Sequence, residues 1–144
     1  MVIHIVETIQ NSKIKVQNQA QRPKTELKYR AFSLSLEIIK FLEGLGYRQA
    51  IKIIADQLIR AVTSIGANIV EAKSAASKRE FLKFFEISLK SAQETKYWLA
   101  MLRELLPDHK DKINDFLRET EEIAKILSSS ILTMKGKRNL KSLI

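Results

Sequence analysis

The sequence predicts an all-α protein, an antiparallel up-down four-helix bundle with a basic N-terminal arm and a basic C-terminal tail. Two observations support this fold class. The 144 residues include only four glycines and two prolines, so few positions can interrupt a long regular element. Apolar residues also recur at intervals of three and four along four successive stretches, which is the period of an amphipathic helix. A chain of this length is expected to form one domain.

The first two helices have recognisable boundaries. We expect the first to begin near Thr25, whose hydroxyl is suited to an N-cap, and to end where Gly44 and Gly46 follow its apolar row. The second is expected from about Arg48 to Lys73. It contains Gly66, which costs about 1 kcal/mol relative to alanine inside a helix. We therefore expect the backbone of another helix to approach closely at this glycine.

The third and fourth helices follow from a capping box and a proline. Ser77 and Glu80 form an S-x-x-E pattern, in which the serine oxygen accepts from the amide of Glu80 and the carboxylate returns to the amide of Ser77. Pro107 ends the third helix, because the residue before a proline is driven out of the helical region. The fourth is expected to start after Asp108 as its N-cap and to end at Gly136. Short turns make consecutive helices antiparallel.

The net charge of +9 is concentrated at the two ends of the chain. Residues 1–30 contain six Lys/Arg and two Glu, and residues 135–144 contain four Lys/Arg and no acid, a surplus of +4 each. The remaining residues carry only +1. The predicted division of the chain is an arm, the bundle and a basic tail: 1–25, 26–135 and 136–144. Basic ends of this kind can contact phosphate backbones, and they can equally serve solubility.

Composition excludes several classes of site. The chain has no cysteine, so it has neither disulfides nor cysteine-based zinc sites, which fits a cytoplasmic location. We expect neither a signal peptide nor a membrane span, because no stretch approaches ~20 apolar residues. The two histidines, His4 and His109, stand far apart, and no spacing of His, Asp or Glu indicates a metal site. We expect no metal, no cofactor and no enzymatic activity.

Two sets of polar residues are candidate sites. A polar stripe runs beside the apolar row of the second helix and continues on the third: Arg60, Ser64, Asn68, Glu71, Ser91 and Glu94. Asn68 and Ser64 are expected to bond across the bundle and fix its register, with Arg60 and Glu71 paired to charges on a neighbouring helix or subunit. Alternatively, the stripe lines a pore, groove or ligand site.

The second set is basic. It comprises the lysines and arginines of the turn between the second and third helices together with those of the tail: Lys73, Lys78, Arg79, Lys83, Lys135, Lys137, Arg138 and Lys141. These side chains could contact phosphates. The turn group is also what a solvated helix end looks like, and that interpretation stays open.

The segments QLIRAVTSIGANIVEA and SKREFLKFFEISLKSAQETKYWL resemble a bacterial four-helix-bundle protein family. It includes proteins encoded in intervening sequences of large-subunit ribosomal RNA genes, and it is similar to the accessory variability proteins of diversity-generating retroelements. The positions that carry the resemblance are Gln57, Leu58, Arg60, Ala61, Ser64, Ile65, Ala67, Asn68, Ile69, Glu71, Ser77, Glu80, Phe81, Ser91 and Glu94. Gly66 and Ala72 depart from the family pattern, which commonly has Pro and Gly there.

The resemblance covers roughly residues 27–134 and implies an up-down bundle that assembles into a ring-like homopentamer. For the retroelement relatives it implies a basic surface that binds nucleic acid and a reverse transcriptase. The function hypothesis is therefore a non-enzymatic, oligomeric bundle that binds RNA or DNA through its basic ends. The alternative is a structural module that docks a protein partner without nucleic acid. Arg103 and His109 also give an Arg-x5-His pattern similar to the RNase motif of HEPN-type domains, which keeps a remote enzymatic alternative.

Overall fold

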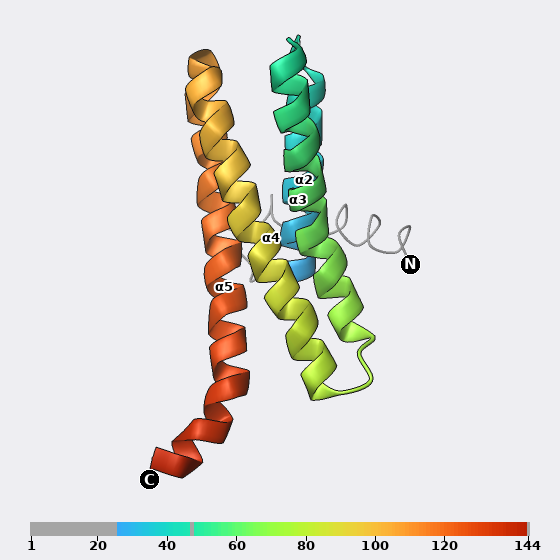
Figure 1. Cartoon of the computed structure of the whole chain (residues 1–144), viewed down its shortest axis with the longest axis vertical. Coiled ribbons are helices and arrows are strands. Elements are labelled where there is room, and N and C mark those ends of the chain that lie inside the picture. The colour runs from blue at the N-terminus through green and yellow to red at the C-terminus, as the bar shows by residue number, and fades with distance from the viewer. Residues whose placement is uncertain (1–25, 47, 144) are drawn as a thin grey trace, which may run out of the picture.

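The computed structural model describes residues 26–46 and 48–143, and the side chains of these residues as far as Gly136. Figure 1 shows a bundle of long helices. The described part contains four α-helices and one 3₁₀ turn: α2 (Leu27–Glu43), α3 (Gln49–Lys73), α4 (Lys78–Leu105), η1 (Pro107–His109) and α5 (Lys110–Leu143). The all-α fold class is confirmed. The predicted arm, residues 1–25, lies outside the described residues.

Consecutive helices run antiparallel (Figure 1). The turn between α3 and α4 has only four residues, and α4 passes into α5 through Leu106 and the 3₁₀ turn. The turn between α2 and α3 and the turn between α4 and α5 therefore lie at one end of the bundle. The α3–α4 turn and the C-terminal end of α5 lie at the other end. This arrangement places segments that are distant in sequence close together in space.

The apolar rows of the four helices meet in a single core, as their periodicity predicts. Its largest fully buried side chains come from every helix: Ile38 and Leu42 from α2, Leu58, Val62 and Ile65 from α3, Leu99 and Leu102 from α4, and Ile113, Phe116, Ile123 and Leu127 from α5. The bundle is therefore held together mainly by burial of aliphatic side chains.

Several small hydroxyls are buried within the apolar rows, and the sequence analysis did not identify them. Ser88 Oγ of α4 donates to the Ile65 carbonyl of α3 at 2.9 Å, and Ser35 Oγ of α2 donates to the Val62 carbonyl at 3.0 Å. A helical carbonyl has a second lone pair that can accept such a bond. These two bonds link neighbouring helices in places where a larger side chain would hold them apart.

Gly66 lies where α2 crosses α3, and the predicted close approach is confirmed. A Cβ atom at Gly66 would stand 3.5 Å from the Cβ of Ala31 and 3.8 Å from backbone atoms of Ala31 and Phe32. These distances are ordinary van der Waals contacts, so a methyl group at this position would already touch α2. Small residues on both helices thus set the α2–α3 separation.

The predicted end of the last helix was wrong. α5 continues through Gly136 to Leu143, so the backbone of the predicted tail is helical. A glycine stops a helix by adopting positive φ, and no described glycine has positive φ. Without that geometry Gly136 costs only about 1 kcal/mol inside a helix, and no proline follows it.

Two predicted N-caps also differ. Glu26, not Thr25, occupies the N-cap position of α2, and its side chain makes no capping bond. Asp108 lies within the 3₁₀ turn rather than capping α5, because Pro107 starts that turn and leads directly into the helix. Gly44 does end α2, although with φ of −75° instead of a left-handed conformation.

By length and composition alone, α3 is long and apolar enough to cross a membrane. Eight of its residues, from Ile51 to Ala72, are buried in the bundle. The helix also carries exposed charges, including Asp56, Arg60 and Glu71. Its apolar side is therefore used by the protein core.

Candidate nucleic-acid interface

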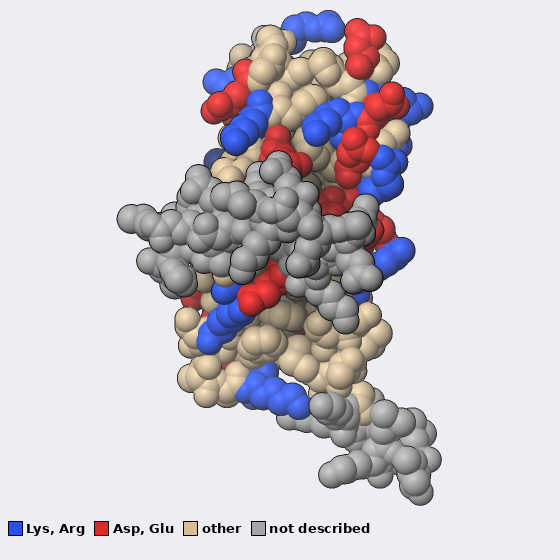
Figure 2. Space-filling view, turned by 180° about the vertical axis from the view of Figure 1, so that it is seen from behind, with Lys and Arg blue, Asp and Glu red and all other residues tan. Residues whose placement is uncertain are grey.

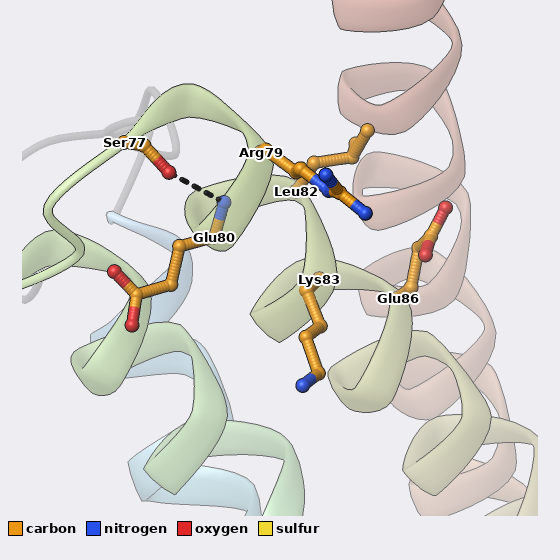
Figure 3. A pocket seen from close by; sticks show the side chains of 6 residues that line it. All are labelled: Ser77, Arg79, Glu80, Leu82, Lys83 and Glu86. Carbon is orange, nitrogen blue, oxygen red and sulfur yellow. Dashed lines mark hydrogen bonds between the residues drawn. The ribbon is translucent and has the colours of Figure 1, made fainter.

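The turn between α3 and α4 is fixed by the predicted capping box, with one change. Ser77 Oγ accepts from the amide of Glu80 at 3.1 Å, as expected. The Glu80 carboxylate accepts from the amide of Ala76 at 2.7 Å, one residue before the amide that was predicted. Both bonds tie the start of α4 to the turn (Figure 3). The basic residues around them are therefore held on an ordered support.

The four cations predicted at this turn are all exposed: Lys73 at the end of α3, and Lys78, Arg79 and Lys83 at the start of α4. Lys73 is engaged with the start of α2, where its Nζ donates to Glu26 at 3.4 Å. That hydrogen bond holds the pKa of the Glu26 carboxyl below its usual value. Lys73 thus partly neutralises an acid, and it contributes less free positive charge than its neighbours.

Lys78, Arg79 and Lys83 make no ion pair with any residue that the structure describes. The nearby acids have other partners: Glu80 accepts from the backbone, and Glu86 pairs with Lys135. In Figure 3, Arg79 reaches from the first turn of α4 toward α5, and Lys83 extends from the next turn. The three cations therefore have no ion-pair partner among the described residues, and Arg79 and Lys83 border a shallow depression of about 490 Å³ together with Glu80 and Glu86.

The N-terminus of α4 adds to this positive charge. The aligned peptide dipoles of a helix place roughly half a positive charge at its first turn. Lys78 and Arg79 belong to that turn. Anionic groups near it would meet both the helix end and the side-chain cations.

The two basic groups predicted from the sequence lie at the same end of the bundle. Lys135 of α5 forms an ion pair with Glu86 of α4 at 2.5 Å, so α5 passes close to the first part of α4 at this position. Lys137, Arg138 and Lys141 follow on the same helix, and their side chains lie outside those described. Their role stays a prediction.

The distribution of charge over one face is consistent with this arrangement. Figure 2 shows basic and acidic side chains interspersed over the upper part of that face. The lower end, where α4 begins and α5 ends, carries lysine or arginine among mainly uncharged residues on the part that is coloured. Interspersed basic and acidic side chains, like those of the upper part, give little net attraction for a polyanion.

The polar stripe is partly as predicted. Ser64 Oγ and Ser91 Oγ lie 2.8 Å apart and link α3 to α4, which confirms a register-fixing bond between these helices. Asn68 was expected to bond across the bundle, but its Nδ2 donates within α3, to the carbonyl and hydroxyl of Ser64 at 2.8 and 3.0 Å. An amide one turn away from Ser64 reaches that residue before it reaches the next helix.

The charged members of the stripe are exposed. Arg60 and Glu71 form no ion pair with the residues described, so the predicted pairing within the chain is not seen. Glu94 accepts from Trp98 Nε1 on its own helix at 3.4 Å. These charges are therefore exposed to solvent, and Glu71 also borders the surface between α2 and α3.

The sequence analysis missed two ion-pair groups that join α5 to other helices. Arg30 of α2 donates to Glu119 through Nε and Nη2 at 2.8 and 2.9 Å and also pairs with Glu122. The bonds to Glu119 raise the pKa of its guanidinium above the ordinary value. Lys96 of α4 donates to Glu121 at 2.6 Å and lowers the pKa of that carboxyl.

No sequence signal could have identified these pairs. Arg30 and Glu119 are 89 positions apart, and each looks like an ordinary solvated residue on its own helix. Their encounter depends on the rotation of α5 about its axis, which only the packed core determines.

Arg103 and His109 are directed to different neighbours. Arg103 Nη1 donates to Asn114 of α5 at 3.0 Å, while the His109 ring packs edge-on against Phe41 with centroids 5.5 Å apart. Both contacts brace the junction of α4, η1 and α5. No cluster of three or more potential metal-binding side chains occurs among the described residues.

This chain is similar to known proteins in sequence and in fold. Residues 24–129 match the family model described as "23S rRNA-intervening sequence protein". The chain belongs to this family. A solved structure of a protein of unknown function from the S23 ribosomal protein family of Bacteroides thetaiotaomicron is 32% identical to this chain, with a TM-score of 0.67. The likeness covers 73% of this chain and 97% of the Bacteroides chain. No curated protein matches the sequence.

The family match begins at residue 24 and ends at residue 129. The intervening-sequence protein described here therefore extends beyond the shared bundle at both ends. Lys135 and the cations that follow it lie in one of these extensions, whereas Lys78, Arg79 and Lys83 lie within the family domain.

Proposed function

We propose that this intervening-sequence protein is a non-enzymatic cytoplasmic protein that binds the phosphate backbone of RNA or DNA through the basic end of its bundle. The contacting residues are Lys78, Arg79 and Lys83, together with the cations at the end of α5. The single observation that supports this proposal best is the Lys135–Glu86 ion pair. It links one cation of the α5 group to the first part of α4, and it pairs Glu86, one of the two acids near Arg79 and Lys83.

The chemistry favours backbone contact over base reading. The three free cations are long, exposed side chains on a convex helix end, with no deep groove between them for a base. Lysine and arginine in such positions fix the placement of a nucleic acid but carry no sequence information. We therefore expect binding with weak sequence preference.

The test is a titration of the purified protein with RNA and with DNA at several salt concentrations. The family description refers to 23S rRNA, which makes an RNA hairpin the first probe. For duplex probes, the contacts of Lys78, Arg79 and Lys83 alone predict that log Kobs falls with log salt with a slope of about −3, and each contact from the end of α5 makes the slope steeper by about one. No binding at low salt, or a flat salt dependence, would contradict the proposal. It would favour the alternative of a protein partner, such as a reverse transcriptase.

We propose further that the protein acts as a homo-oligomer, a pentamer if it follows the family resemblance. Supporting observations are the outward-facing, unpaired Arg60 and Glu71, and exposed apolar residues such as Ile53, which is 58% exposed. Light scattering is expected to give a mass several-fold above the 16.5 kDa of one chain. A mass equal to one chain over a range of concentrations would exclude this assembly.

A further inference from the structure

An apolar groove lies between α2 and α3 on the outer surface of the bundle. It has a volume of about 440 Å³, and its apolar walls are formed by Phe32, Leu36 and Ile39 of α2 and by Ala67 and Val70 of α3. Leu36 is 37% exposed although it is surrounded by other apolar side chains. The groove takes no part in the basic end or in the polar links between α3 and α4.

The close crossing at Gly66 explains the shape of this groove. Because Gly66 and Ala31 bring the two helices together at one point, the larger side chains on either side stand up as walls. The groove extends from Lys28 to Ile39 along α2. The twelve residues from Lys28 to Ile39 span about 16 Å along the helix axis.

The chain contains a second set of apolar residues that needs a partner. The 25 residues before Glu26 carry Val2, Ile3, Ile5 and Val6 in one short run. A segment of this length is well below the roughly 40 residues that a core of its own requires. These side chains gain free energy only by packing against another surface.

The point at which this segment joins the bundle favours the α2–α3 groove as that surface. Residue 25 is bonded to Glu26, and Lys28, two residues further on, lines one end of the groove. Nineteen residues lie between Val6 and Glu26, and a linker of that length has an r.m.s. end-to-end distance of roughly 25 Å. The linker is therefore long enough to span the groove, which is a requirement for a high effective concentration.

The charges of the N-terminal segment and of the groove also favour their association. Glu71 lies at the same end of the groove as Lys28 and forms no ion pair with any described residue. The segment carries four Lys/Arg, with Arg22 and Lys24 next to the junction, against the single acid Glu7. A basic segment entering past Glu71 therefore meets a carboxylate that has no ion pair with a described residue, since Lys28 pairs with Glu26.

From these observations we propose that the N-terminal segment, residues 1–25, folds back along α2 and docks the apolar run Val2–Val6 in the α2–α3 groove of its own chain. The segment then covers apolar surface that would otherwise promote non-specific association. It also adds a layer to the bundle on the side away from the α4–α5 surface.

The absence of cysteine allows a direct test on the full chain. One variant carries Ile5→Cys with Ala67→Cys, which places a thiol on the exposed groove wall. The matched control carries Ile5→Cys with Gln93→Cys. Gln93 is exposed on α4, between Glu86 and Lys96, both of which reach toward α5. Thiol–disulfide equilibrium with glutathione gives the effective concentration of each pair.

We expect the effective concentration within one chain to be at least tenfold higher for the Ala67 pair than for the Gln93 pair. Equal values would overturn the proposal, because they would show tethering without docking. Disulfides that form mainly between chains, giving a species of twice the monomer mass, would also overturn it and identify a second copy as the occupant. Both pairs replace exposed bundle positions, so the bundle should fold in each.

A further variant separates apolar packing from charge attraction. Ile3→Asp, added to the Ile5→Cys and Ala67→Cys pair, is expected to lower the effective concentration to the control value. Gln19→Asp makes the same change of charge at a polar position of the segment and is expected to leave it within about twofold. A similar loss with both substitutions would mean that apolar side chains do not anchor the segment.

Discussion

Replacing Lys78, Arg79 and Lys83 together with glutamate is expected to weaken RNA binding at low salt by ~100-fold or more. Each lost phosphate contact should also reduce the magnitude of the salt slope by about one. All three side chains are exposed and free of ion pairs with the described residues, so their whole charge is available to a ligand. The measurement is the titration described above, repeated with the variant at matched salt concentrations.

The matched control reverses three exposed lysines at the opposite end of the bundle, namely Lys40, Lys52 and Lys110. Each reversal changes the charge by two, so both variants go from +9 by −6 to +3. The two variants are expected to differ in RNA affinity only if the binding site lies at the α3–α4 turn. If the control loses as much affinity, binding depends on overall charge, and the proposed interface is wrong.

The reversal at the turn should leave the bundle folded, which keeps this experiment interpretable. Lys78 and Arg79 occupy the first turn of α4, where the helix dipole favours acidic side chains by about 0.3–1 kcal/mol each. The capping bonds of Ser77 and Glu80 involve neither residue. A loss of RNA binding with an unchanged unfolding midpoint would therefore reflect the interface itself.

Features of the fold that depend on local chemistry were predictable from the sequence. The box at Ser77 and Glu80 uses atoms within four residues, and Pro107 acts on the residue beside it, so both were identified correctly. Gly136 was misjudged because a glycine permits a left-handed stop but does not impose one. Whether the helix stops at Gly136 or continues depends on the free energy of the next helical turn. That free energy cannot be read from the local sequence pattern.

The candidate site was predictable in its composition but not in its assembly. The lysines and arginines could be identified from charge alone, and Ser64 was expected to bond across the bundle, although its partner Ser91 was not predicted. The Lys135–Glu86 contact could not be predicted, because it depends on how α5 is rotated and placed against α4. That arrangement is determined by packing of the core and not by any local pattern.

Replacing Phe116 with alanine is expected to lower the free energy of unfolding by about 3–5 kcal/mol. Phe116 is 2% exposed, and its ring packs edge-on against Phe41 of α2 with centroids 5.5 Å apart. It fills the space where α5 meets α2, so its removal leaves a cavity as well as losing an aromatic contact. A loss of this size is a large part of the roughly 5–15 kcal/mol that stabilises a typical domain.

Urea unfolding at one fixed protein concentration measures this loss and avoids the shift that self-association would cause. Leu132→Ala on the same helix is the control, because Leu132 is 69% exposed and should change stability by no more than about 0.5 kcal/mol. Phe116→Leu should lie between the two, since it keeps most of the volume but loses the ring contact with Phe41. If Phe116→Ala costs no more than Leu132→Ala, α5 does not pack against α2 as described. The register that brings Lys135 to Glu86 would then also be in error.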